Sequence, residues 1–170
     1  MNNIEHIKYT YKHRKIVMLL AKKYFSDNID LLEQIQYHDL DKLYMYLFYN
    51  KSDVSKIHRN LVAHHENDLE KTNLDYIEMV LDWESARYTK PDKPLNAYDT
   101  LYNYYPDMLD KILPILKTIG LDKSNLSMEN DVVEFTNSLN NISIEEITEE
   151  LIKYLKIFTN GTQKYKIKQK

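Results

Sequence analysis

The stretch "IEHIKYTYKHRKIVMLLAKKYF", residues 4–25, decides the fold that we expect for this chain. Apolar side chains recur along it at helical spacings, as at Ile16, Val17 and Leu20, and His13 lies on the same stripe. The stripe is wide, which is typical of a helix that neighbours cover on much of its surface. We therefore predict that this segment is the central helix of its domain.

Residues that break helices are absent from the first 90 positions. The chain of 170 residues has 2 glycines, Gly120 and Gly161, and its 4 prolines all lie within residues 91–114. A protein built from strands and tight turns would need more glycine, so the sequence predicts an all-α fold. Gly120 and Gly161 suit the C-terminal ends of helices, and Pro114 should bend or divide the helix that contains it.

Capping residues mark where several helices should begin. Asp41 is placed to cap one helix, and Ser143 with Glu146 has the spacing of a capping box. Apolar periodicity supplies the rest of the assignment. After the first helix, we expect helices at residues 29–37, 42–49, 54–67, 73–89, 95–105, 107–119, 127–139 and 143–158.

The histidines divide the chain into regions of different character. All 6 histidines lie before residue 66. We expect residues 1–105 to form a compact helical domain that carries the chemistry, and residues 106–162 to form a helical extension packed on it. Residues 163–170 are basic and are expected to be a flexible tail.

Composition excludes several classes of function. The chain has no cysteine, which excludes disulfides, thiolate zinc sites and a cysteine nucleophile. It has no long apolar run and no apolar leader, so we expect a cytoplasmic protein without a membrane span. The formal net charge of −3 argues against nucleic-acid binding, which only the basic tail would favour.

The stretch "QYHDLDK", residues 36–42, can be interpreted in two ways. Asp39 could cap the start of a helix by accepting hydrogen bonds from backbone N–H groups. His38 and Asp39 could instead form a metal-binding pair, since imidazole and carboxylate are common metal ligands. The doublet alone leaves both interpretations open.

Other ligand-type residues favour a shared metal site. Glu78 and Asp82 are four residues apart, so they share a helix face, and they flank an apolar run. They could form a solvated stripe, but acidic groups buried in such a setting need a cation or several donors. The residue types that could ligate a metal occur at His13, His38, Asp39, His58, His64, His65 and Asp82.

The order of these residues resembles the HD-domain superfamily of metal-dependent phosphohydrolases, whose pattern is H…HD…(H…H)…D in an all-α fold. The motifs "YKHRKIV", "HDLDK", "HRNLVAHHEN" and "YIEMVLDWESAR" are similar to an uncharacterised HD-like group of bacterial and phage proteins. The likeness covers about residues 6–90. It implies one or two divalent metals, of Mn, Fe, Zn, Mg or Co type, at His13, His38, Asp39, His64, His65 and Asp82, with His58 as a further candidate.

The resemblance also implies roles in catalysis. Asp39, Lys42 and Glu78 are expected to serve the reaction, and Lys42 and Arg59 to bind the substrate. Some members of the superfamily have a glutamate at the position of Lys42 that activates water. A lysine is protonated near neutral pH and is better suited to holding a phosphate oxygen, so the identity of the base stays open.

Two functions are therefore expected from the sequence. The first is hydrolysis of a nucleotide or another small phosphoester, with a small phosphorylated substrate as the binding partner. The alternative is a non-catalytic helical interaction protein, with a structural or vestigial metal site and a protein partner or a homodimer. The tyrosine-rich run "NAYDTLYNYYPDM", residues 96–108, offers side chains of the kind found at interfaces.

Overall fold

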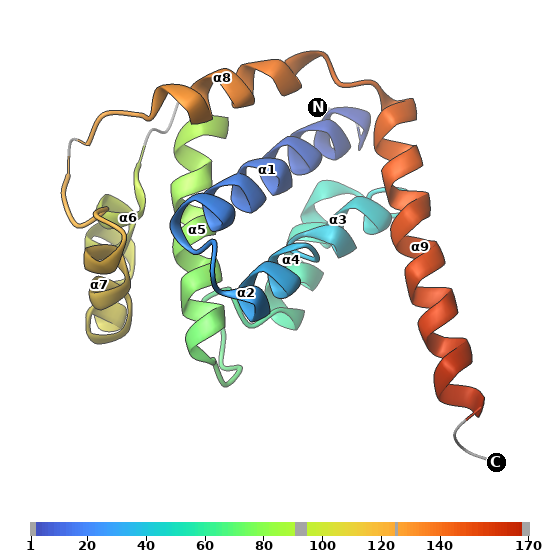
Figure 1. Cartoon of the computed structure of the whole chain (residues 1–170), viewed down its shortest axis with the longest axis horizontal. Helices are drawn as coiled ribbons and strands as arrows, with labels where there is room; N and C mark the ends of the chain where they lie inside the picture. Colours follow the sequence, from blue (N-terminus) through green and yellow to red (C-terminus); the bar gives the residue numbers. More distant parts are fainter. Residues whose placement is uncertain (1–2, 91–94, 125, 168–170) are drawn as a thin grey trace. The chain divides into compact units, whose positions relative to one another are not determined.

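The computed structural model describes the backbone of residues 3–90, 95–124 and 126–167, with side chains up to residue 156 (Figure 1). Every regular element in these ranges is helical, which confirms the predicted all-α fold. The α-helices are α1 Asn3–Tyr24, α2 Ile29–Ile35, α3 Leu40–Met45, α4 Lys51–Leu61, α5 Asn73–Thr89, α6 Ala97–Tyr104, α7 Leu109–Thr118, α8 Asn130–Ser138 and α9 Ile144–Ile167; the short 3₁₀ helices are η1 Pro106–Met108 and η2 Leu139–Asn141.

The helices fall into two units. Residues 1–140 form the first unit, and residues 141–170, which contain α9, form the second. The division lies beyond α6, α7 and α8, so these helices belong with the N-terminal helices by their contacts. The boundaries expected at residues 105 and 162 stay predictions, and the expected tail at 163–170 lies partly outside the described residues.

Helix α1 is central to the first unit, as predicted. It packs against α5 most extensively and also contacts α2, α3 and α8. Ile16, Val17 and Leu20 of α1 are fully buried, as are Val80 and Leu81 of α5. Each such side chain contributes about 1.5–3 kcal/mol by leaving water. The α1–α5 pair therefore forms the frame on which the other helices of this unit pack (Figure 1).

Helix α5 is held in register by defined ends and a buried ion pair. Thr72 and Asp75 form a capping box at its start. Near its end, Glu84 accepts a hydrogen bond of 3.2 Å from Arg87 and another of 2.9 Å from the backbone N–H of Ala97. Arg87 also donates to the carbonyl of Leu126. These bonds tie α5 to the start of α6 and to the segment before α8.

Four local expectations need correction. The helix expected over residues 54–67 ends at Leu61 in the structure. Asp41 does not cap the third helix, because α3 begins at Leu40 and Asp41 lies in its first turn. Pro114 does not divide α7, which continues through it, since the helix tolerates one missing backbone donor. The last helix does not stop at Gly161 but extends to Ile167, since one glycine costs a helix only about 1 kcal/mol.

The predicted helix end at Gly120 and the predicted capping box at Ser143 and Glu146 agree with the structure. Gly120 follows α7 with a φ of +73°, and the N–H of Leu121 donates to the carbonyl of Leu116, as expected at a C-cap. The backbone N–H of Ser143 donates to Glu146, and Glu146 N–H donates to the Ser143 hydroxyl. The predicted capping box of the last helix is confirmed.

We expect Glu84→Ala to destabilise the protein by about 3 kcal/mol, because it leaves the buried Arg87 and the Ala97 N–H without their acceptor. Urea unfolding followed by circular dichroism measures this loss. Glu134→Ala, at an exposed position on α8, is the control and should change the free energy of unfolding by less than about 0.5 kcal/mol. Equal stability of the two variants would contradict the structural role of Glu84.

Candidate metal centre

Ligand-type side chains from four parts of the first unit converge beside α1 and α5. The histidines and carboxylates come from α1, from the link between α2 and α3, from α4 with the segment after it, and from α5. Three overlapping groups of them place their donor atoms within 4.8 Å of one another and could hold a metal ion. The residues of these groups, all buried, are His13, His38, Asp39, His58, His64, His65 and Glu78.

The backbone at Asp39 is folded to present its carboxylate to this centre. Asp39 has a φ of 53°, in the left-handed region that a residue with a side chain rarely adopts. It occupies the N-cap position of α3 but makes no side-chain capping bond. The buried Arg14 guanidinium donates to the carbonyls of Gln36, at 3.0 Å, and of His38. The capping interpretation of Asp39 is therefore wrong, and Arg14 fixes the unusual turn.

One set of donor atoms, which we call the first subsite, consists of His13 Nε2, His38 Nε2, Asp39 Oδ2 and Asp82 Oδ1. His13 Nε2 lies 2.8 Å from Asp82 Oδ1 and 3.3 Å from His38 Nε2. Asp39 Oδ2 lies 3.8 Å and 3.9 Å from the same two nitrogens. Ligands about 2.1 Å from one ion are themselves about 3–4.2 Å apart, depending on the coordination geometry, so these atoms are close to a suitable spacing.

A second set, which we call the second subsite, consists of Asp39 Oδ1 with the Nε2 atoms of His58, His64 and His65. All four atoms are buried, and none has a hydrogen-bond partner among the described residues. Asp39 Oδ1 lies 2.9 Å from His58 Nε2 without the alignment of a hydrogen bond. Buried polar atoms are rarely left unsatisfied in this way, and these four lie close enough together that they could hold a cation.

The opposite nitrogens of the same rings are held by protein groups. His38 Nδ1 lies 2.8 Å and His64 Nδ1 3.0 Å from the same oxygen of Glu78, so one carboxylate orients a ring in each subsite. Gln34 donates to the other Glu78 oxygen at 2.6 Å. With Nδ1 as the donor, each ring directs the lone pair of Nε2 into the centre.

Two further rings are oriented in the same way. His58 Nδ1 lies 2.7 Å from Asp41 Oδ2, and His13 Nδ1 lies 2.9 Å from the Ser85 hydroxyl. Ser85 donates its own proton to the carbonyl of Asp82, so its oxygen is free to accept from His13. Ligands of a metal are commonly supported by such partners, which fix the ring and its tautomer.

The electrostatics of the centre keep two carboxylates and two of the imidazoles in forms that can bind a cation. Burial alone would raise the pKa of Asp39, but His38 and Lys42 outweigh it and hold the pKa well below its usual range. The pKa of Asp82 is likewise depressed, against burial, chiefly by His13. Burial lowers the pKa of His38, and it lowers that of His65 to about 3. These two rings therefore stay neutral near neutral pH.

The metal centre opens into a cavity of about 610 Å³ that is lined by residues of α1, α3, α4 and α5. Lys42 lies on the wall, and its Nζ is 2.9 Å from Asp39 Oδ2. Arg59 also lines the cavity, mostly exposed and 3.5 Å from Glu66. Glu66 is 4.0 Å from His65 Nδ1, which is too far to orient that ring by a hydrogen bond.

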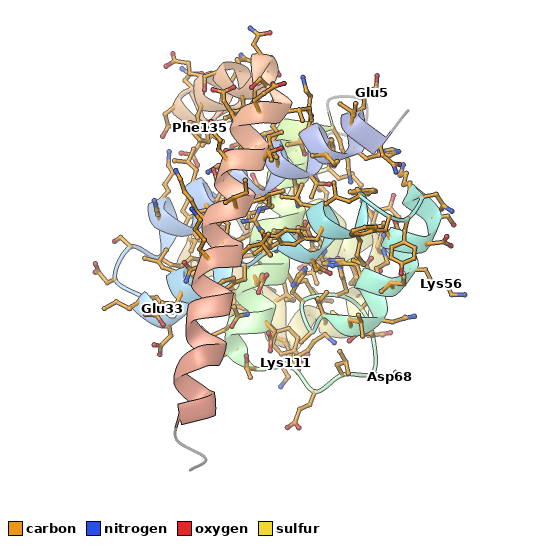
Figure 2. All side chains as sticks on the ribbon, turned by 90° about the vertical axis from the view of Figure 1, so that its right-hand side faces the viewer. Glu5, Glu33, Lys56, Asp68, Lys111 and Phe135 are labelled. Atoms are coloured by element: carbon orange, nitrogen blue, oxygen red, sulfur yellow. The ribbon has the colours of Figure 1, made fainter. Side chains whose placement is uncertain are left out.

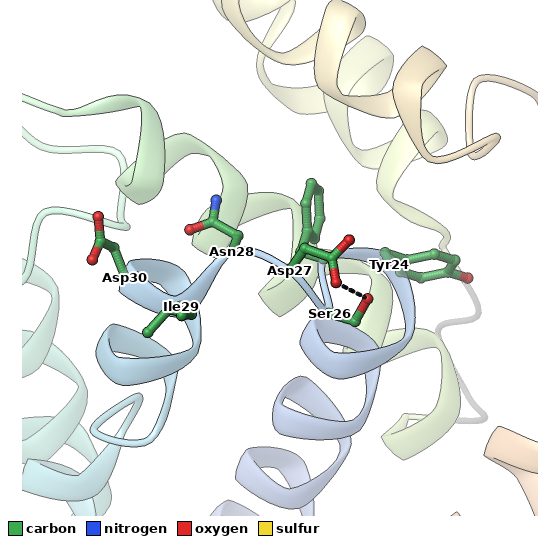
Figure 3. A pocket seen from close by; sticks show the side chains of 7 residues that line it. Tyr24, Ser26, Asp27, Asn28, Ile29 and Asp30 are labelled. Atoms are coloured by element: carbon green, nitrogen blue, oxygen red, sulfur yellow. Dashed lines mark hydrogen bonds between the residues drawn. The ribbon is translucent and has the colours of Figure 1, made fainter.

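A second hollow lies over residues 24–30, between α1 and α2, and has no such convergence. Asp27 bonds to Ser26, whereas Asp30 points away from both (Figure 3). Asn28 caps α2 by accepting from the backbone N–H of Leu31. These polar groups serve the local turn, so the chemistry is concentrated at the centre described above.

The structure brings together every metal ligand expected from the sequence. His58, expected as a further candidate, joins the second subsite, whereas Glu78 lies behind the rings that it orients. The supporting roles of Arg14, Asp41 and Ser85 were not predicted from the sequence. Ser85 follows Asp82 by three residues on one helix, which is a spacing that could have suggested it. No local spacing marks Asp41 or Arg14, because their partners lie far away in the chain.

Comparison with known proteins adds no relative. A scan against protein-family models, a search of curated proteins and a search of solved structures each found no match. Within the described residues, no helix combines the length and the apolar character needed to cross a membrane. Arguments about function therefore rest on the geometry of the site and on the order of its residues.

We expect Glu78→Gln to weaken metal binding in both subsites by about 10–100-fold, because the neutral amide holds the rings of His38 and His64 less firmly. Titration against a competing chelator measures the affinity. Glu70→Gln, at an exposed position outside the centre, should bind metal like the wild type. Unchanged affinity in Glu78→Gln would show that Glu78 does not orient the ligands.

His65→Gln should separate the two subsites. His65 belongs to the second subsite and has no atom in the first, so its loss should leave the first intact. We expect the bound metal to fall from about two ions to about one per chain. Elemental analysis after loading with Mn²⁺ and desalting gives the ratio. A variant that binds as much metal as the wild type would remove His65 from the ligand set.

Proposed function

We propose that the chain is a metal-dependent phosphohydrolase of HD-domain type, which acts on a nucleotide or another small phosphoester. One observation carries the proposal: the two oxygens of Asp39 face two different sets of buried imidazole nitrogens. A carboxylate in this position can bridge two cations. The order of the ligands along the chain, which resembles the superfamily, supports the same interpretation.

The donor set fits a divalent transition metal. Both subsites combine neutral imidazole with carboxylate, a mixture that suits Mn, Fe, Co or Zn better than Mg, which prefers oxygen ligands. His13, His38, Asp39 and Asp82 would hold one ion, and Asp39, His58, His64 and His65 the other. When bound, such metals lower the pKa of water and polarise a phosphoryl oxygen.

The residues of the protein prepare the site for an anionic substrate. Burial opposes the charge of Lys42, but Asp39 and Asp82 outweigh it and raise the pKa of this ammonium group. Lys42 therefore stays protonated and can neutralise a phosphoryl oxygen, but it is a poor acceptor for a proton. Asp82 stays ionised and lines the cavity, so its carboxylate can orient an attacking water by accepting a hydrogen bond from it.

Asp39→Asn should abolish turnover if the proposal is right. The amide cannot offer an anionic oxygen to both subsites, so hydrolysis of p-nitrophenyl phosphate and of nucleotides should fall by at least about 1,000-fold. Asp68→Asn is a matched control, because Asp68 is an exposed carboxylate that points away from the molecule (Figure 2). The assay is run with Mn²⁺ and repeated with EDTA.

Three results would contradict the proposal. The first is a wild-type protein that holds no metal after loading. The second is a metal-loaded protein that hydrolyses none of the phosphoesters tested. The third is turnover that persists in Asp39→Asn or in EDTA.

The interaction protein remains the alternative function, and one observation favours it. The tyrosine-rich run divides in the structure: Tyr105 stacks on Trp83 at 4.9 Å between ring centroids, whereas Tyr102 and Tyr104 are exposed. Exposed tyrosines are enriched at interfaces. A stable dimer in solution, combined with absence of hydrolysis, would favour this function over the enzyme.

A further inference from the structure

The cavity beside the metal centre extends well beyond the metal ligands. On α1, His13 lies at the metal end and His6 lines the cavity seven residues earlier. On α4, His58 belongs to the centre and Lys51 lines the cavity, again seven residues earlier. Seven residues of α-helix span about 10 Å, so both walls continue for this distance from the ligands.

Contacts near His6 define the end of the cavity away from the metals, which we call the outer end. The ring of His6 stacks on that of Tyr46 at 5.4 Å between centroids. Lys51 lines the cavity together with His6, and burial, followed by the charge of Lys51, lowers the pKa of His6. Asn3 donates to the carbonyls of Tyr46 and Tyr49 and so fixes the start of α1 against the segment before α4.

The cations that line the cavity form two groups. Lys42 and Arg59 lie near the metal ligands, Lys42 against Asp39 and Arg59 beside His58 in the chain. Lys51 lies at the outer end, and Lys90 stands over the ring of Tyr9, 5.9 Å from its centroid. Neither Lys51 nor Lys90 forms an ion pair with a described residue.

The acidic groups of the lining do not balance these outer cations. The carboxylates that line the cavity, Asp39 and Asp82, both belong to the first subsite. Among the residues that line the cavity, Lys51 and Lys90 therefore leave an excess of positive charge away from the place where the reacting phosphoryl group would bind. A cavity with cations at separate positions is suited to a ligand that has two separate anionic groups.

We infer that the substrate carries a second phosphate-like anion, bound by Lys51 at the outer end and by Lys90 above the ring of Tyr9, while the reacting phosphoryl group lies at the metals. The inference rests on the proposed function for the reacting end only. A doubly phosphorylated small molecule meets both requirements, whereas a simple monoester leaves the outer cations without a partner.

Non-hydrolysable phosphonates test this directly. Hexylphosphonate has one anionic group, and the matching α,ω-hexanediphosphonate has a second at the far end of the same chain. Calorimetry on the full-length, Mn²⁺-loaded protein should show the diphosphonate binding about tenfold tighter than the monophosphonate. In Lys51→Met/Lys90→Met the diphosphonate should lose this advantage, while the affinity for the monophosphonate should stay within about twofold.

Lys56→Met is the matched control. Lys56 is on the same helix as Lys51, but it does not line the cavity and points outward (Figure 2). This variant should retain the full preference for the diphosphonate. Equal binding of the two phosphonates by the wild type, failure of the diphosphonate to bind, or a preference that survives in the double variant would each overturn the inference.

The outcome is distinguishable from failure of the proposed function. Binding of phosphonates needs no turnover, so the preference is measured even if the protein hydrolyses nothing. A protein that shows the lysine-dependent preference but no hydrolysis would support the outer anion site and contradict the phosphohydrolase. A protein that hydrolyses phosphoesters without this preference would support the phosphohydrolase and contradict the outer anion site.

Discussion

The buried carboxylate of Asp39 is the constraint on which the centre depends. Removing a carboxylate from water costs several kcal/mol unless charges and donors surround it. Here Lys42 approaches one oxygen, the imidazoles of two subsites surround both, and the backbone adopts a left-handed turn to place the group. Arg14 holds that turn from α1. Folding of the central helix and formation of the centre are therefore coupled.

Glu78 extends this coupling to a second helix. One of its oxygens contacts the rings of His38 and His64, which belong to different subsites. The other oxygen accepts a hydrogen bond from Gln34 of α2. Helix α5, which carries Glu78, is also the principal packing partner of α1. The apolar contact between these two helices thus sets the distances between ligands that are far apart in the sequence. Because these ligands come from rigid helices and from turns held by buried hydrogen bonds, little reorganisation is needed to receive a cation.

The sequence predicted the fold class and the residues that converge at the centre, because both are encoded by residue type and order. Absence of helix breakers and the wide stripe of α1 were sufficient for the all-α class. His13, the His38–Asp39 doublet and Asp82 were found from their order. Arg14 and Asp41 were not, because a partner 24 or 17 residues away is determined by packing alone, and the three-residue spacing of Ser85 from Asp82 was not used. Helix-breaking residues also gave wrong predictions at Pro114 and Gly161, because the helices that contain them continue at a small cost in stability.

The balance of charge explains why the centre would need two cations to receive a phosphate. Asp39, Asp41, Glu78 and Asp82 bring four negative charges to the centre, and Lys42 returns one positive charge. The carboxylates outweigh burial and raise the pKa of His58 and His64, so a proton on either ring would offset part of this excess when no cation is bound. With both rings neutral, one divalent ion would leave the centre negative and repel a phosphoryl group. A second would take the place of any protons on these rings and make the centre positive. The same imidazoles would then serve as counter-charges in the empty site and as ligands in the occupied one, and only the occupied site would attract an anionic substrate.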